Sequence, residues 1–297
     1  MNPPWIPLRS IRATYKLLMA FWSRFHLKYF WQAWQALDEE AAAERARLAG
    51  ADYRPAITLF VAAFCLLLIH YLKFATTFEA FLEWGSLAGG HAAGYWQKQL
   101  AGTGFFPLLA YLWWWAWHVI GYVLIPVLVI NYVFRDQVGN YGLCIGDLAR
   151  HLPWYALLAA PILCFAVLAS FREDFTAYYP FYRQADRSWA DLLMWESLYL
   201  SQFVCLEFFF RGFLLQGCKT AFGANAILVM CLPYLMIHFP KPWLEATGAI
   251  FFGLFLGMLA LRSRSIWGGV LVHITIALSM DLLALLQTRG LPVRWWP

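Results

Sequence analysis

Long apolar stretches separated by short polar ones make up most of this chain of 297 residues. Several of them exceed the roughly 18 consecutive apolar residues that indicate a membrane-spanning helix. The pattern predicts an all-α, polytopic membrane helix bundle with about seven transmembrane helices. Their approximate limits are 56–74, 105–134, 153–171, 190–216, 225–239, 244–262 and 266–287. Residues 76–104 are less apolar and rich in glycine, which favours a short re-entrant or surface helix.

Residues 1–54 precede the first span and mix basic with aromatic side chains. Trp22 and Phe25 interleave with Arg24 and Lys28, a pattern typical of an amphipathic helix lying on a membrane surface. The chain is therefore expected to divide into three parts. They are an interfacial, cytoplasmic region at 1–54, a transmembrane scaffold at 55–189 and a helix bundle at 190–288 that holds most of the buried charge.

Composition narrows the class of partner. Hydrophobic residues make up 62% of the chain and charged residues only 13%, which leaves too little polar surface for a large soluble domain. The net charge of +5 is spread over loops, as expected beside lipid headgroups, and predicts membrane lipids rather than nucleic acid as partners. With the N-terminus in the cytoplasm, most of the 22 Lys and Arg residues fall on the cytoplasmic side, so the positive-inside rule favours that orientation.

Ionisable residues inside spans are costly and are therefore candidates for function. Apart from His118, which we interpret as a hydrogen-bonded core histidine, they concentrate in the last four spans. Glu207 and Arg211 stand four residues apart, so they share a helix face and can pair. Together with His238 and His273 on neighbouring helices, Glu207 forms a candidate water-activating site. The carboxylate would be the general base, and the imidazoles would orient water or stabilise an oxyanion.

Three further carboxylates have simpler interpretations. Glu245 falls in the first turn of the sixth span, where a negative charge complements the helix dipole. Asp281 lies eight residues after His273 and leans toward the same face, but it also suits a bond to a neighbouring helix. We keep Glu245 and Asp281 as supporting candidates for the site, and we interpret Glu196 as structural.

The segment from Glu207 to Gly212 resembles the first motif of the CAAX protease and bacteriocin-processing (CPBP, or Abi) family of intramembrane endopeptidases. That motif has two adjacent glutamates, three variable residues and an arginine. The second motif, an aromatic residue followed four positions later by histidine, is matched by Tyr234 and His238. His273 matches the histidine of the third motif. The resemblance covers residues 190–287.

The resemblance implies a glutamate-type protease acting on a membrane-associated protein or peptide, in a bacterial inner membrane. Glu207 would deprotonate a water that His238 positions, His273 would stabilise the oxyanion, and Arg211 would hold Glu207 in place. Two positions depart from the family pattern, because Leu206 replaces the first glutamate and Ala277 replaces the asparagine after the third histidine. Either the protein is inactive, or Glu207 is the base and a nearby polar residue takes the role of that asparagine. Thr275, Ser279 and Asp281 are the candidates.

Three alternatives remain open at this point. Glu207, His238, His273 and Asp281 offer ligands for zinc, although the chain has no HExxH motif and the primary expectation is no cofactor. A second alternative is a non-enzymatic function, as a catalytically inactive CPBP-like scaffold or immunity protein. A transporter would also use buried Glu, His and Asp, but the chain shows no internal repeat. The six cysteines include no CxxC pair and are interpreted as small buried hydrophobes.

Overall fold

The computed structural model describes residues 27–48, 50–241 and 243–297. Within these ranges the chain is all helical, without strands, as the apolar pattern predicts. Among the described residues, six helical runs are long and apolar enough to cross a membrane. They are Arg54–Leu72, Phe106–Phe134, Leu148–Ala169, Trp189–Met236, Glu245–Ser263 and Trp267–Gln287.

The difference from seven expected spans arises at one turn. The run Trp189–Met236 contains both the fourth and the fifth predicted spans. It comprises α10 (Trp189–Glu207), a π-helical segment, α11 (Leu215–Phe222) and α12 (Ala226–Met236). Gly223 reverses the chain between α11 and α12 with a φ of +58°. A side chain there would also collide with Asp38, whose Oδ1 accepts a hydrogen bond from the Ala224 N–H. Glycine at this position therefore lets α12 return beside α11 as a short helix of its own.

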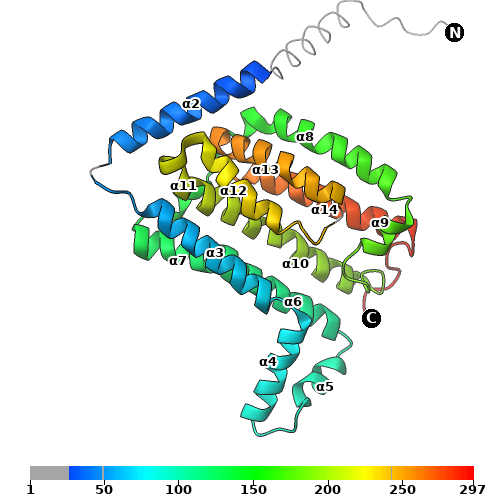
Figure 1. Cartoon of the computed structure of the whole chain (residues 1–297). Helices are drawn as coiled ribbons and strands as arrows, with labels where there is room; N and C mark the ends of the chain where they lie inside the picture. Colours follow the sequence, from blue (N-terminus) through cyan, green and yellow to red (C-terminus); the bar gives the residue numbers. More distant parts are fainter. Residues whose placement is uncertain (1–26, 49, 242) are drawn as a thin grey trace, which may run out of the picture.

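The helices form layers around α10 and α11 (Figure 1). One side is covered by α3 (Arg54–Leu72), α6 (Phe106–Val119) and α7 (Ile125–Leu128). The other side holds α8 (Leu148–Ala169), α13 (Trp243–Ser263) and α14 (Trp267–Gln287). This arrangement surrounds the run that carries Glu207 with protein.

Helices occupy both of the regions that the sequence predicts to be peripheral. Helices α4 (Ala75–Ala88) and α5 (Tyr95–Ala101) form a hairpin that projects from the bundle, in the region expected to be a re-entrant or surface helix (Figure 1). Helix α2 (Leu27–Ala46) crosses the turn at Gly223 and buries Leu37 and Ala41 against the bundle. Trp22, Arg24 and Phe25 of the predicted amphipathic pattern lie outside the described residues.

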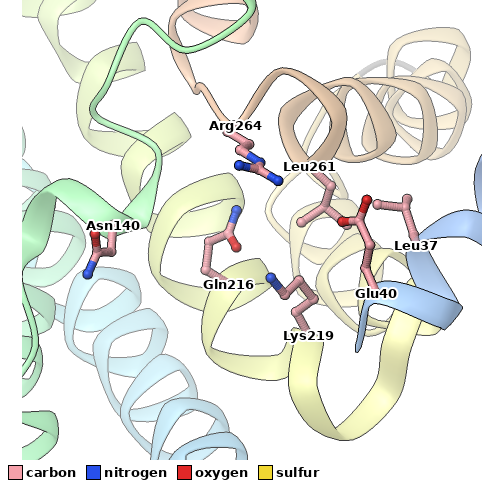
Figure 2. A pocket seen from close by; sticks show the side chains of 7 residues that line it. All are labelled: Leu37, Glu40, Asn140, Gln216, Lys219, Leu261 and Arg264. Carbon is pink, nitrogen blue, oxygen red and sulfur yellow. The ribbon is translucent and has the colours of Figure 1, made fainter. Parts of the chain in front are cut away.

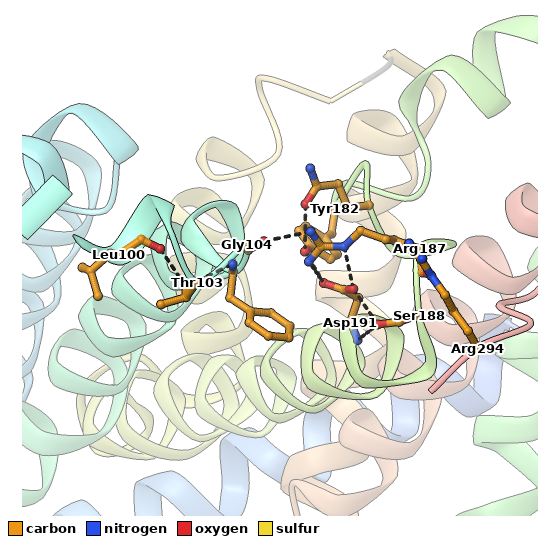
Figure 3. Close-up of polar contacts among 10 residues, drawn as sticks. Leu100, Thr103, Gly104, Tyr182, Arg187, Ser188, Asp191 and Arg294 are labelled. Carbon is orange, nitrogen blue, oxygen red and sulfur yellow. Dashed lines mark hydrogen bonds and ion pairs between the residues drawn. The ribbon is translucent and has the colours of Figure 1, made fainter. Parts of the chain in front are cut away.

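The opposite end of the bundle is fixed by a polar network around the start of α10 (Figure 3). Both oxygens of Asp191 accept hydrogen bonds from Arg187, at 2.7 and 2.8 Å, and the Ser188 hydroxyl caps the helix. Arg187 also donates to the carbonyl of Gly104, and the Arg294 carbonyl accepts the N–H of Trp189. The C-terminal residues and the loop before α6 are thereby tied to the helix that leads to Glu207.

The remaining buried groups outside the site behave largely as expected. His118 is buried, and its Nδ1 lies 2.7 Å from the Trp114 carbonyl, which confirms its interpretation as a core histidine. All six cysteines are free, but only Cys65, Cys205 and Cys218 are buried. The interpretation as buried hydrophobes is wrong for Cys144 and Cys164, which are exposed. Glu196 is buried in α10 with no hydrogen-bond partner for either carboxylate oxygen.

Candidate active site

Glu207 is the last residue of α10, and the next seven residues, Phe208–Leu214, continue as a π-helix. Segments of this kind, with hydrogen bonds from residue i to i+5, are rare in proteins. Those that do occur are often found at functional sites. Every residue of the segment is buried, and five of the seven are phenylalanine or leucine, on both sides of the charged Arg211. The local sequence thus places a charged pair in an apolar interior.

The carboxylate of Glu207 contacts two other charged or titratable groups. Its Oε1 lies 3.0 Å from Nη1 of Arg211 and 2.9 Å from Nδ1 of His273. The side chains of Glu207 and Arg211 are completely buried. Neither carboxylate oxygen, and none of the three guanidinium nitrogens, makes a hydrogen bond of standard geometry with another protein group. The pair is therefore balanced in charge but retains hydrogen-bonding capacity, which buried polar groups rarely leave unused.

His273 is held on α14 by contacts to both of its ring nitrogens. Nδ1 lies 3.1 Å from the Gly269 carbonyl, and Nε2 lies 3.0 Å from the hydroxyl of Tyr234. Nδ1 faces only acceptors, the Gly269 carbonyl and the Glu207 carboxylate, and is therefore an N–H donor. Nε2 can either accept the tyrosine O–H or carry a hydrogen of its own. Phe203 of α10 stacks on the ring, with centroids 5.3 Å apart. His273 keeps 13% of its side-chain surface exposed, so the cluster can be reached from the imidazole side.

Tyr234 connects the second motif histidine to this cluster. The guanidinium carbon of Arg211 lies 4.1 Å from the centroid of the tyrosine ring, a cation–π contact. The backbone carbonyl of Tyr234 accepts a hydrogen bond from Nδ1 of His238, at 2.7 Å. Sequence reasoning gave Tyr234 no chemical role, although its position four residues before His238 was the signal that places it on the same helix face.

His238 lies in the turn beyond Met236, where the span ends. The centroids of the His238 and Tyr234 rings lie 4.6 Å apart. Burial lowers the pKa of His238 to about 4, so the imidazole is neutral at pH 7. Because Nδ1 donates to the backbone, Nε2 is left as an acceptor that can hold a water proton.

Gly269 permits the close approach of α14 to the carboxylate. A Cβ at this position would stand 2.2 Å from Oε2 of Glu207, which is much shorter than a van der Waals contact distance. The residue lies one helical turn before His273, whose Nδ1 meets its carbonyl. A glycine at position 269 is therefore part of what brings Glu207 and His273 together.

The supporting candidates lie in other clusters. Oδ2 of Asp281 accepts a hydrogen bond from the Trp195 indole at 2.8 Å. Glu245, in the first turn of α13 as predicted, pairs with Lys241 at 2.9 Å and accepts from the Tyr179 hydroxyl at 3.1 Å. Burial and the nearby Glu245 raise the pKa of Tyr179, which keeps it a donor.

Thr275 and Ser279, the two hydroxyl residues that could replace the family's asparagine, do not contact Glu207 either. Ser279 donates to the Thr275 carbonyl of its own helix, and Thr275 is exposed. Ala277 itself is buried in an apolar cluster. None of the three candidates, Thr275, Ser279 and Asp281, is therefore recorded in contact with Glu207.

The zinc alternative does not match the donor geometry. Among the described residues, no three His, Cys, Asp or Glu side chains are grouped closely enough to hold a metal ion. Of the four proposed ligands, Asp281 is bonded to Trp195 instead. The position of Arg211 beside Glu207 also supplies the positive charge that a metal would bring.

The three motifs follow one another along the chain, and Tyr234 and His273 of the later two lie against the Glu207–Arg211 pair of the first. Residues 188–279 match the family model of Rce1-like type II CAAX prenyl endopeptidases. This Rce1-like segment contains Glu207, Arg211, Tyr234, His238 and His273, and the match confirms the resemblance to the CPBP family over these residues. No curated protein and no solved structure matches the chain.

The Rce1-like segment begins one residue before α10 and ends within α14. Helices α2 to α9 lie outside it. The match supports a membrane protease activity of the CAAX type in general, acting on protein or peptide in a lipid environment. The six apolar helical runs likewise identify an integral membrane protein.

Proposed function

We propose that this protein is an intramembrane endopeptidase that hydrolyses a peptide bond of a membrane-associated protein or peptide, with Glu207 as the general base. The observation that carries the proposal is the Glu207 carboxylate itself. It is fully buried, it contacts Arg211 and His273 at 3.0 and 2.9 Å, and it keeps unused acceptor capacity. A carboxylate in this setting is suited to bind and deprotonate a water molecule.

In the proposed reaction, Glu207 accepts a proton from water, and the hydroxide oxygen bonds to the carbonyl carbon of the scissile peptide. The carbonyl electron pair moves to oxygen, where the partly exposed His273 stabilises the negative charge. Collapse of the tetrahedral intermediate breaks the C–N bond, and Glu207 returns its proton to the leaving amine. Arg211 balances the carboxylate charge, Tyr234 fixes the His273 ring, and His238 orients the water through Nε2.

The test compares buried carboxylates on one helix. The substrate is first identified as a membrane protein whose processing stops when the gene is deleted and resumes with the wild-type chain. Glu207→Gln and His238→Ala are then expected to abolish that processing without loss of folding. Glu196→Gln is the matched control, because Glu196 is buried on α10 without a hydrogen-bond partner and is not part of the cluster. Full processing by both site variants would refute the assignment.

A second candidate is a non-catalytic CPBP-like membrane protein, and two buried residues favour it. Leu206 and Ala277 are apolar and buried at the positions where the family has glutamate and asparagine. If this candidate is correct, Glu207→Gln leaves the phenotype of the wild-type chain unchanged. Adding the missing groups with Leu206→Glu and Ala277→Asn would then create cleavage that the wild-type chain lacks.

We further propose that the protein lies in a bacterial inner membrane with its N-terminus in the cytoplasm. The orientation rests on the distribution of Lys and Arg in the loops, and the bacterial membrane rests on the resemblance to the CPBP family. Cys144 is exposed between the second and third spans, on the side that this orientation places in the cytoplasm. In a variant that keeps only this cysteine, a membrane-impermeant maleimide should label it only after the cells are permeabilised. Labelling of intact spheroplasts would reverse the orientation.

A further inference from the structure

A cavity of about 170 Å³ lies where α2 crosses the ends of α11 and α13 (Figure 2). It is lined by two leucines and by Glu40, Asn140, Gln216, Lys219 and Arg264. Lys219 follows Glu207 by twelve residues along a continuous helical run, which corresponds to about 18 Å at 1.5 Å per residue. The cavity is therefore separate from the candidate active site.

The cavity lies at the level where membrane-spanning helices end. Arg264 stands in the turn between Ser263, the last residue of α13, and Trp267, the first of α14. Lys219 lies in the last turn of α11, just before the chain reverses at Gly223. Since both spans end here, the lining side chains are at the depth of the lipid headgroups rather than in the hydrocarbon.

Arg264 has a backbone conformation that calls for an explanation. Its φ of +54° is left-handed, which is unfavourable for a residue with a side chain. It is exposed, and no ion pair or hydrogen bond of its guanidinium is present within the described ranges. Figure 2 shows the guanidinium and the Gln216 amide pointing toward each other at the cavity. The turn thus holds an unpaired cation against a polar cavity.

Two cations and one carboxylate line the cavity, and Glu44, just outside the lining, balances the second cation. Lys219 pairs with Glu44 of α2 at 2.9 Å. Arg264 and Glu40 are the other two charged residues at the cavity, one positive and one negative, and Glu40 also has no partner among the described residues. A ligand that carries one negative and one positive group would match this pattern better than a simple anion. Hydrogen bonds from a ligand to a carboxylate or a guanidinium group are stronger when the ligand group is itself charged.

We propose that this cavity binds the phosphoethanolamine headgroup of a membrane lipid. The N–H groups of Arg264, Lys219 and Gln216 donate to the phosphate, and the Glu40 carboxylate accepts from the primary ammonium. A choline headgroup is a poorer match, because its quaternary nitrogen has no N–H and is recognised by aromatic rings, none of which line the cavity. The lipid would pin α2 to the end of α11. This proposal is independent of any peptidase activity.

The first experiment compares headgroups. The full-length chain is purified in detergent, delipidated, and titrated with phosphatidylethanolamine, phosphatidylcholine or phosphatidylglycerol of identical acyl chains, with binding read by native mass spectrometry. We expect the ethanolamine lipid to bind at least tenfold more tightly than the other two. Soluble phosphoethanolamine distinguishes the source, since competition by it at lipid-like concentrations would assign the cavity to a free metabolite and overturn the lipid assignment. Equal binding of all three lipids would also overturn it.

The second experiment uses variants that keep the fold. Arg264→Gly removes the guanidinium and accepts a φ of +54° without strain, so folding should be preserved. Glu40→Gln removes the negative charge from an exposed position. Each should weaken binding of the ethanolamine lipid about tenfold, the loss expected for a charge-assisted hydrogen bond. The matched controls Arg262→Gln and Glu39→Gln lie next to the lining residues but do not line the cavity, and should bind normally. Equal loss in variants and controls, or loss in neither, would refute the site.

Discussion

The spans before residue 170 and the run that follows them differ in what surrounds them. In the first three spans, 28%, 28% and 17% of the most apolar stretch is buried within the protein. In Trp189–Met236 the buried share is 72%. The earlier helices therefore present most of their surface outward, whereas α10, α11 and α12 are enclosed by other helices. Both regions are apolar in sequence, but only one forms a protein interior.

The difference explains where charge is tolerated. A charged side chain facing lipid is costly, and charges inside spans usually pair or face the bundle interior. Glu207 and Arg211 are fully buried in the enclosed run and pair with each other. The outer spans instead bury His118 against a backbone carbonyl. Enclosure by the scaffold is thus a precondition for the candidate site, and four substitutions test the contrast.

The largest effect is expected for Arg211→Leu. The change leaves the Glu207 carboxylate buried without its cation, and breaking a buried pair in this way costs about 3–5 kcal/mol. Thermal unfolding in detergent, followed by tryptophan fluorescence, should show a large loss that the double variant with Glu207→Gln partly restores. Arg150→Leu is the control, because Arg150 is exposed at the start of α8 and should tolerate the change. Similar losses in both would contradict the contrast.

Gly269→Ala should have the next largest effect. The added methyl group would meet Oε2 of Glu207 at 2.2 Å, so the carboxylate or α14 must shift, at a cost of about 1–3 kcal/mol. Under the proposed function, the rate of substrate processing should fall strongly even where the loss of unfolding free energy is small. Gly248→Ala on α13 is the matched control, since nothing lies within 4 Å of its added Cβ. If Gly248→Ala reduced processing or stability more than Gly269→Ala does, the close contact between Gly269 and Glu207 would not be required for the site.

Tyr234→Phe should cost less. It removes the hydroxyl that bonds Nε2 of His273 but keeps the ring beneath Arg211, so the expected loss is about 1 kcal/mol. Because His273 would lose its fixed orientation, substrate processing should slow while the unfolding temperature changes little. The control is Tyr132→Phe in the second span, where the tyrosine is exposed. Unchanged processing in Tyr234→Phe would remove Tyr234 from the site.

Much of this arrangement could be predicted from the sequence. The apolar stretches define the spans to within a few residues, because crossing a bilayer requires about twenty apolar residues wherever it occurs. The spacing of Glu207 and Arg211 predicts their pairing, which the structure confirms at 3.0 Å. Helix depth predicts that His273 lies at about the level of Glu207, and the two lie 2.9 Å apart.

Other features depend on contacts between helices, which a single sequence does not specify. Two contacts follow from how α13 and α14 pack on α10 and on the loop at 170–188. They join Asp281 to Trp195 and Glu245 to Tyr179. The role of Tyr234 follows from ring contacts to Arg211 and His273 on two other helices. The merging of two predicted spans into one run reflects the short α12, which ends at Met236.

The smallest effect is expected on the outer face of α8. Leu168 is 70% exposed there, so in a membrane its side chain contacts lipid, which is as apolar as leucine. Leu168→Ala should change the unfolding free energy by no more than about 0.5 kcal/mol, the usual range for surface substitutions. Leu214→Ala, in the enclosed run and completely buried, provides the reference for a core position. A loss at Leu168 that approaches the one at Leu214 would mean that α8 packs against protein in the membrane. The outer spans would then be an interface, and the contrast between the two regions would hold only for the isolated chain.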